Sequence, residues 1–227
     1  MSNMKTKSTT IVLFWSMLVI WAGSVAYSQI DSEESDPVLT YYWNKAAEKA
    51  PTVDPGLILS RYRCAVLARR FRIDSDGRLG RADSVLVDMF LTGNTLDSQK
   101  VIRGDIDKIG DIELQFPSPF ANEYRLNFFP NDTGGEGLAI GLVSDSSLAN
   151  QPDGLIVIDR REYYLRSLYL YYPEKSGYKR FTRTYNFQLV DGVLFPSEIV
   201  EIATKMGIFI SSTYRMELEI SGVELLK

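Results

Sequence analysis

Residues 154 to 220 carry five stretches of strand-forming residues: GLIVID (154–159), EYYLRSLYLYY (162–172), YKRFTRTYNFQLV (178–190), VLFPSEIVEIAT (193–204) and GIFISSTYRMELEI (207–220). Apolar residues recur at every second position, which places their side chains on one face of a pleated strand. In the last stretch the even positions from Tyr214 to Ile220 are apolar, and the odd positions between them are polar. This alternation predicts an antiparallel sheet with one face against a core or a cavity.

The first 28 residues have the three parts of a secretory signal peptide. Lys5 and Lys7 precede an apolar run over residues 11–22, and the small residues that follow end at Ser28. The run is shorter than the roughly 20 residues that span a membrane. We expect export with cleavage near Ser28, and an uncleaved N-terminal anchor is the alternative. Residues 29–37 are acidic and predict a flexible lead-in, so that residues 38–227 form a single domain.

The composition favours binding over catalysis. The chain has no histidine and one cysteine, Cys64, which excludes the Ser-His-Asp and Cys-His arrangements, a disulfide within the chain and a cysteine-based zinc site. We expect no enzymatic activity, no metal and no cofactor, although a carboxylate pair for glycoside hydrolysis stays open. The formal net charge of −4 argues against nucleic acid as a partner.

The N-terminal half adds helices and further strands. Residues 38–50 have helical spacing, with Tyr42 and Trp43 as large anchors on the sheet. Residues 57–73 fit a helix or a strand, but the turn at residues 74–77 favours a hairpin. Residues 97–116 have weak helical periodicity and predict short helical turns over the sheet. Together the two halves of the chain carry roughly eight to ten predicted strands in meander order. This arrangement predicts an α+β domain or a curved, incompletely closed barrel.

Aromatic residues are dense between residues 163 and 187. Parity places Leu165 with Tyr169 and Tyr171 on one face of their strand. These side chains either form an ordinary core with cross-strand aromatic pairs or line a cavity for a lipid-like ligand. The candidate cavity wall comprises Tyr42, Trp43, Tyr163, Leu165, Tyr169, Tyr171, Phe181, Tyr185 and Phe187.

Arginines surround the first predicted hairpin. Arg61, Arg63 and Arg69 share one parity and therefore one face of the strand. In a chain of net negative charge they predict a local basic patch for anionic headgroups or an acidic partner. A solvated hairpin is the alternative.

Two short motifs resemble those of the periplasmic lipoprotein-carrier superfamily, which includes the LolA/LolB-like outer-membrane lipoprotein-sorting proteins. Gly154 opens a strand that ends in Asp159, and a later strand follows the pattern of Asp191-Gly192, then Pro196 and Ile199. The resemblance covers about the C-terminal 70 residues. It implies a strongly curved antiparallel sheet, a half-open barrel, with helices packed on its concave face.

The resemblance also implies a function without catalysis. We expect an exported, periplasmic and monomeric carrier or binding protein for a lipid-like or lipoprotein acyl ligand. The alternative is an envelope interaction or sensor module that uses the same sheet to bind a protein partner.

Overall fold

The computed structural model describes residues 36–53, 61–114, 119–121, 124–128, 135–144, 151–173, 175, 177–207 and 212–226. The predicted signal peptide, its cleavage site and all but the end of the predicted lead-in lie outside these residues.

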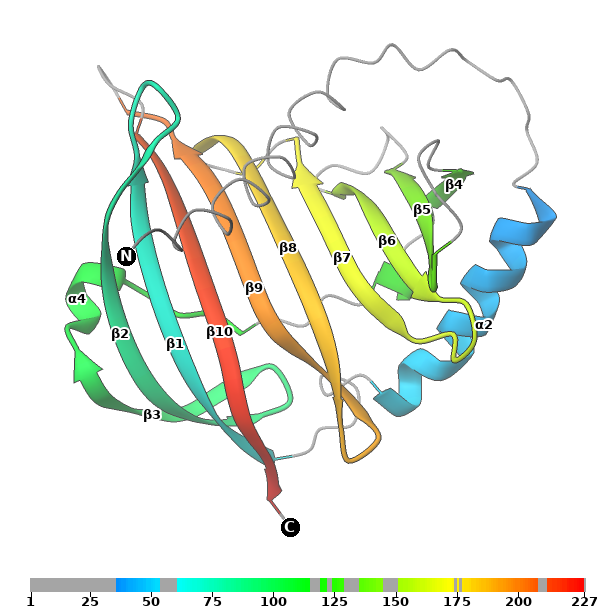
Figure 1. Cartoon of the computed structure of the whole chain (residues 1–227), viewed down its shortest axis with the longest axis horizontal. Coiled ribbons are helices and arrows are strands. Elements are labelled where there is room, and N and C mark those ends of the chain that lie inside the picture. Colours follow the sequence, from blue (N-terminus) through cyan, green and yellow to red (C-terminus); the bar gives the residue numbers. More distant parts are fainter. Residues whose placement is uncertain are drawn as a thin grey trace, which may run out of the picture. The chain divides into compact units, whose positions relative to one another are not determined.

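The described chain forms one ten-stranded antiparallel sheet with two helices (Figure 1). The elements are α2 (Pro37–Val53), β1 (Arg61–Ile73), β2 (Leu79–Thr92), β3 (Thr95–Gly104), α4 (Ile106–Ile109), a 3₁₀ turn (Pro119–Ala121), β4 (Tyr124–Phe128), β5 (Gly137–Ser144), β6 (Asp153–Asp159), β7 (Leu165–Tyr172), β8 (Tyr178–Val190), β9 (Val193–Lys205) and β10 (Ser212–Leu226).

The strand order is β3-β2-β1-β10-β9-β8-β7-β6-β5-β4. Two meanders, β1 to β3 and β4 to β10, are joined where the first strand pairs with the last. The predicted hairpin at residues 74–77 is confirmed, because β1 and β2 pair antiparallel on either side of it. In the turn the Asp74 carboxylate accepts hydrogen bonds from the backbone N–H groups of Asp76 and Arg78. Asp191 and Gly192 both have positive φ, as a two-residue hairpin between β8 and β9 requires.

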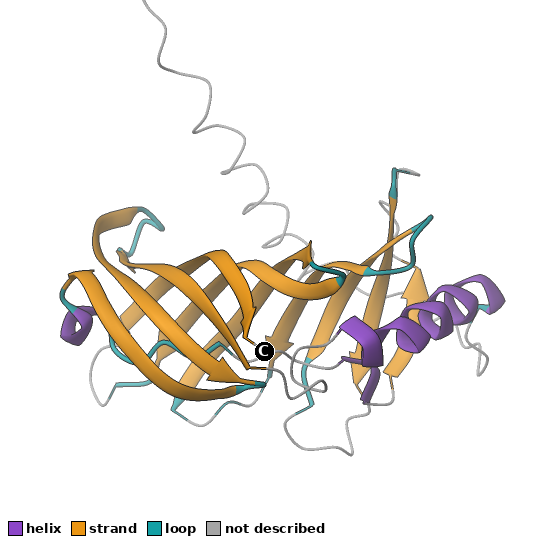
Figure 2. Ribbon diagram, turned by 90° about the horizontal axis from the view of Figure 1, so that it is seen from below, coloured by secondary structure: helices purple, strands orange, loops and turns teal. Residues whose placement is uncertain are grey.

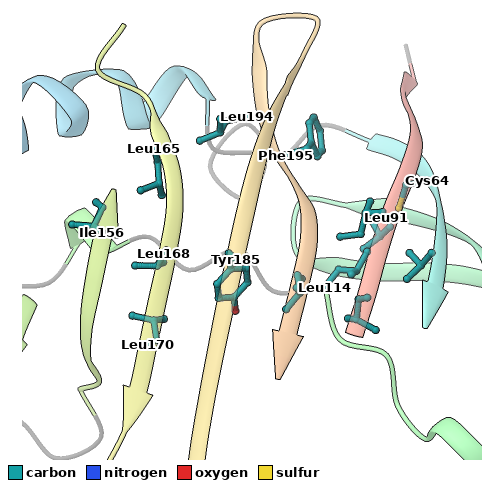
Figure 3. Packing of buried hydrophobic residues seen from close by; sticks show 14 of the residues in the cluster. Cys64, Leu91, Leu114, Ile156, Leu165, Leu168, Leu170, Tyr185, Leu194 and Phe195 are labelled. Atoms are coloured by element: carbon teal, nitrogen blue, oxygen red, sulfur yellow. The ribbon is translucent and has the colours of Figure 1, made fainter. Parts of the chain in front are cut away.

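One face of the sheet is apolar across nine strands. Residues directly opposite one another on neighbouring strands form a continuous row, which we call the apolar row: Val85, Ala68, Leu218, Ile199, Tyr185, Leu168, Ile156, Ile140 and Phe128. All but the last are at most 4% exposed. Figure 3 shows part of this packing, with Ile156, Leu168 and Tyr185 side by side. Cross-strand contacts of this kind stabilise a sheet more than strand propensity does.

Both helices pack against this apolar face, at opposite ends of the sheet (Figure 2). In α2, Leu39 and Ala46 are buried, and the helix contacts β4 and β9. The single turn of α4 contacts β1 and β2 through the buried Ile109. The prediction of an antiparallel sheet that does not close into a barrel is confirmed. No helix in the described ranges is long and apolar enough to cross a membrane.

The prediction of short helical turns over residues 97–116 is correct only for α4 and wrong for the residues of β3. Residues 97–104 belong to β3, and within the described residues 97–114 only residues 106–109 are helical. All ten residues of β3 are exposed, so the strand has no apolar alternation by which it could be recognised. Gly104 ends it with φ 96°, at a point where any Cβ would collide with the backbone of Ser84.

A β-bulge in β7 corrects the predicted faces of that strand. Ser167 pairs with Val157, whereas Leu165 pairs with the adjacent Ile158. Arg166 is therefore an extra residue in β7 that has no residue opposite it on β6. Leu165 therefore lies on the same face as Leu168, in the main core, and not with Tyr169 and Tyr171 as parity predicts.

Candidate functional site

A groove of about 510 Å³ lies between β2 and β3 on one side and α4 with residues 110–114 on the other. Its apolar lining comes from both sides of this gap: Met89, Leu91, Leu96, Ile106, Ile112 and Leu114. Met89 and Leu91 are at most 2% exposed, and Met89 is on the face of the sheet that carries the apolar row. The groove therefore extends the apolar face to the β3 edge of the sheet.

The segment after β3 packs against β1 and β2 and, among the described residues, leaves the outer edge of β3 unpaired. Asp105 caps α4 by accepting a hydrogen bond from the backbone N–H of Asp107, and Gly110 ends the helix with φ 86°. Arg70 in β1 donates a hydrogen bond of 3.3 Å to the carbonyl oxygen of Ile109, which fixes α4 against the sheet. The position of α4 is thus set by its local caps, by the burial of Ile109 against the sheet and by the hydrogen bond from Arg70.

The residues after α4 alternate between the apolar lining and the mouth of the groove. Ile112 and Leu114 are buried, whereas Asp111 and Glu113 are exposed. With the exposed Asp107, these two carboxylates form what we call the acidic rim of the groove. Lys108 is the basic residue within this segment, and its Nζ lies 3.9 Å from the Asp105 carboxylate.

None of the nine predicted cavity residues lines this groove. Three of them, on α2 and the β6–β7 turn, hold the helix in place. Tyr42 and Tyr163 have ring centroids 5.7 Å apart, and the Trp43 ring lies 4.7 Å from that of Phe120. Lys49 also donates a hydrogen bond to the carbonyl oxygen of Glu162. Their contribution to ligand binding stays a prediction.

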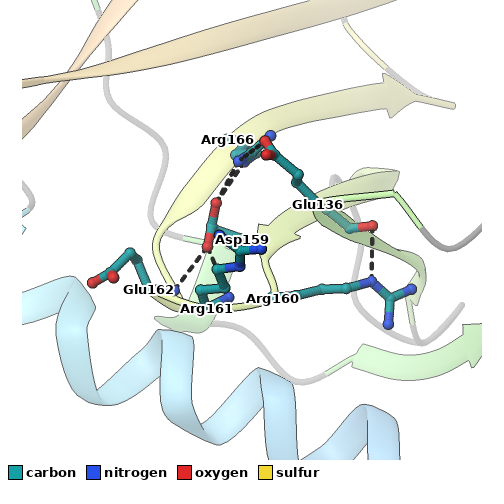
Figure 4. Close-up of polar contacts among 7 residues, drawn as sticks. Glu136, Asp159, Arg160, Arg161, Glu162 and Arg166 are labelled. Carbon is teal, nitrogen blue, oxygen red and sulfur yellow. Dashed lines mark hydrogen bonds and ion pairs between the residues drawn. The ribbon is translucent and has the colours of Figure 1, made fainter.

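The turn that carries Tyr163 is anchored by Asp159 (Figure 4). The Asp159 carboxylate accepts hydrogen bonds from the backbone N–H groups of Arg161 and Glu162 and from Nε of Arg166 at 2.8 Å. Burial alone would raise the pKa of Asp159, but these hydrogen bonds and the Arg166 charge lower it below its ordinary value. The network stabilises a turn in which Tyr163 has the uncommon φ of 58°.

Phe181, Tyr185 and Phe187 lie on β8 at the middle of the sheet. Phe181 and Tyr185 are at most 2% exposed, and the rings of Tyr185 and Phe187 are stacked 6.1 Å apart. Beside them Arg183 and Glu201 form a buried ion pair of 2.7 Å, and Tyr214 donates a hydrogen bond to Glu201. These aromatic residues thus pack around a buried charge pair.

The remaining candidates lie away from the main core. Tyr169 is half-buried and Tyr171 is 36% exposed, on the face of β7 opposite to Leu168. Arg61, Arg63 and Arg69 share the solvent face of β1, as parity predicts. Arg63 pairs with Asp88 at 2.8 Å and Arg69 with Glu219 at 3.1 Å. Neighbouring carboxylates therefore balance much of the predicted basic patch, whose role in binding stays a prediction.

The chemistry of the described residues offers no metal centre. No group of three or more histidine, cysteine, aspartate or glutamate side chains converges within the described ranges. Cys64 is buried, and burial raises the pKa of its thiol to about 12, which is the behaviour of a structural cysteine.

Sequence reasoning missed the residues that line the groove. Ile106 and Ile109, spaced for one helical turn, and the alternation of Ile112 and Leu114 with acidic residues were the available signals. Each is too short to indicate a structure alone, because the groove exists only where this segment meets β2 and β3.

Comparisons with known proteins concern the fold. A LolA superfamily protein from Nitrosomonas europaea matches over 83% of this chain and 94% of its own, with 14% identity and a TM-score of 0.39. The fold is distantly similar to that of LolA superfamily proteins. A DUF1329 family protein from Desulfovibrio piger matches over 84% of this chain and 94% of its own, with 9% identity and a TM-score of 0.43.

A third similar structure is the Pseudomonas aeruginosa MucA/MucB complex, which matches over 84% of this chain and 99% of the chain compared, with 8% identity and a TM-score of 0.27. No protein-family model and no curated protein matches the sequence.

Proposed function

We propose that this protein is an exported, non-enzymatic binding or carrier protein that holds a lipid-like or acyl group in the groove beside β3. The observation that carries the proposal is the apolar face of the sheet, which continues across nine strands and ends in the groove. The volume of about 510 Å³ is within the range of roughly 300–1,000 Å³ found for small-ligand sites.

The lining accounts for affinity without catalysis. Burying an apolar chain against Met89, Leu91 and Leu114 contributes about 25 cal/mol for each Å² removed from water. In this proposal the helices act as a lid on a concave face of the sheet, residues 1–28 are removed on export, and the protein works as a monomer in the periplasm.

Binding of the neutral fluorescent probe N-phenylnaphthylamine tests the proposal. Leu96 lines the groove and is 41% exposed, so Leu96→Glu places a charge beside the ligand at small cost to folding. Loss of about 1.4 kcal/mol of apolar contact would weaken binding about tenfold. The matched control is Ile102→Glu, also in β3 and 54% exposed but not part of the groove lining.

Native mass spectrometry of protein purified from its own envelope adds an independent measurement, because a bound lipid would appear as a defined mass increment. The proposal fails if no lipid is recovered and the wild-type protein does not bind the probe. It also fails if Leu96→Glu and Ile102→Glu bind the probe equally well.

A second candidate function, an interaction or sensor module for a protein partner, is favoured by β3. This strand is at the edge of the sheet, and it exposes three large apolar side chains, Leu96, Val101 and Ile102. A photo-crosslinking residue introduced at Val101 would capture such a partner. Crosslinking confined to lipid would count against this candidate.

A further inference from the structure

β3 has an edge to which a further strand could pair. Within the described part of the chain no strand pairs with its outer side, and the sheet ends there (Figure 1). An unpaired edge presents a row of backbone N–H and C=O groups that bind an extended peptide readily. In addition, all ten residues of β3 are exposed to solvent.

Two bulges restrict this edge to a short stretch. The register between β2 and β3 shifts at Asp97 and at Ile102, which leaves Ser98 to Val101 as the regular part of the strand. Bulges twist a strand edge and hinder edge-to-edge association of whole sheets. A short segment is therefore the partner that the edge fits, rather than a second sheet.

The faces of β3 determine which partner side chains reach the groove. Gln99 lines the groove and pairs with Met89, whereas Lys100 pairs with Asp88 on the opposite face. A segment paired with residues 98–101 would place every second side chain on the groove side. An apolar residue at such a position would lie on the same face as Gln99, beside the groove.

The acidic rim determines the charge of the neighbouring partner residues. Asp107, Asp111 and Glu113 stand at the mouth of the groove. Lys108 is directed to Asp105 and Lys175 interacts electrostatically with Glu113, so the three carboxylates keep the rim net negative. An anionic fatty acid or phospholipid headgroup would meet like charge there, whereas lysine or arginine would meet opposite charge. Residues two positions before and after the apolar anchor share its face and would face this rim.

We propose that β3 and the groove together form a docking site for a short, extended segment of a partner protein. On its groove side this segment carries one apolar residue flanked by lysine or arginine. The proposal rests on the groove being a binding site, as proposed above, and it deepens the second candidate function by giving the chemical class of the protein segment that would bind.

The test is an NMR titration of the ¹⁵N-labelled full-length mature protein with the peptide acetyl-TKTLTKT-amide. In this peptide every second residue is threonine, and the positions between are lysine, leucine and lysine. These three side chains therefore share one face of the extended peptide. We expect chemical-shift changes at the β3 amides and around the groove, and at least tenfold weaker binding of acetyl-TETLTET-amide. Raising the salt concentration should weaken binding of the lysine peptide.

N-methylation tests the strand pairing. Neighbouring residues of a strand direct their backbone N–H groups to opposite edges, so two peptides are compared, one N-methylated at its threonines and one at its lysines and leucine. We expect one of these two N-methylated peptides to lose binding and the other to retain it. Equal binding of both peptides would overturn the pairing with β3.

Charge reversal tests the rim. Asp111→Lys with Glu113→Lys should weaken binding of the lysine peptide about tenfold, since two exposed ion pairs become repulsive. The control, Asp76→Lys with Glu162→Lys, changes the net charge equally at two exposed turns and should leave binding unchanged. Equal effects of the two double variants would overturn the role of the rim.

The neutral probe separates this proposal from the proposed function. If N-phenylnaphthylamine binds in a Leu96-dependent manner but the lysine peptide leaves the β3 amides unshifted, the docking proposal is wrong and the apolar binding function stands. If neither ligand binds, both are wrong.

Discussion

Replacing Glu201 with glutamine would leave the guanidinium of Arg183 in the interior without its counter-charge. Arg183 is 8% exposed and Glu201 6%, and two hydrogen bonds of 2.7 and 3.2 Å join them. Burial acts against the charged form of Arg183, but Tyr185 and Glu201 together raise its pKa above the ordinary value. Arginine is not deprotonated in proteins at ordinary pH, so Arg183 stays charged in the Glu201→Gln variant.

The expected loss of stability follows from the burial of the pair. Removing one partner of a buried ion pair costs about 3–5 kcal/mol, and the amide oxygen that glutamine keeps places this change near 3 kcal/mol. In a protein of this size, each kcal/mol corresponds to about 2–4 °C in Tm. Glu201→Gln should thus lower the Tm by about 6–12 °C, measured by circular dichroism and checked by guanidinium unfolding at 25 °C.

The matched control is Glu219→Gln on the neighbouring strand. Glu219 also pairs with an arginine, Arg69, but its side chain is 60% exposed, so its loss should cost less than about 1 kcal/mol. If the two variants lose similar amounts of stability, burial does not control the strength of the pair. A second outcome against the reasoning is a Tm of Glu201→Gln within 2 °C of the wild type, roughly the effect of a single weak surface pair.

Two further predictions concern the motifs around the β6–β7 hairpin. Gly154→Ala should destabilise the protein by about 1–3 kcal/mol in guanidinium unfolding, because its Cβ would lie 2.5 Å from the carbonyl oxygen of Tyr169. Gly141→Ala is the control, since its Cβ would meet the Asn127 carbonyl oxygen at an ordinary 3.5 Å, and equal losses would contradict the prediction. Asp159 has a lowered pKa in the folded state, so its contribution is complete above its unfolded pKa of about 3.9 and is lost as the pH falls through the folded value. The stability difference between wild type and Asp159→Asn should shrink below pH of about 4, and a difference independent of pH would refute this assignment.

The parts of the fold that could be predicted from the sequence are those with a local signal. The alternation from Tyr214 to Ile220 has a matching burial pattern, because β10 has one covered face. The turns at Asp74 and at Asp191-Gly192 depend on side-chain hydrogen bonding and positive φ, which are local properties. The roles of Gly154 and Asp159 are also local to one hairpin, so their motif is recognisable in the sequence.

The features that could not be predicted depend on distant neighbours. The bulge that turns Leu165 into the core is decided by pairing with β6, and parity counting assumes that no bulge exists. β3 lacks alternation because neither of its faces is covered. The groove requires α4 to lie against β2, and Arg70 in β1 helps to hold the helix there through its hydrogen bond to Ile109. The aromatic candidates Tyr42 and Trp43 were recognisable as anchors of a helix, but their ring partners come from segments far along the chain.

The pairing of β1 with β10 has a consequence for the order of assembly. β10 lies between β1 and β9 and completes both pairings, and Arg69 and Glu219 in the first of these are 150 residues apart. Until the C-terminal strand is available, β1 and β9 each keep a long unpaired edge in two separate part-sheets. Non-local pairing of this kind slows folding, and exposed edges aggregate. The addition of β10 is therefore the step that removes both unpaired edges and ends this aggregation-prone stage.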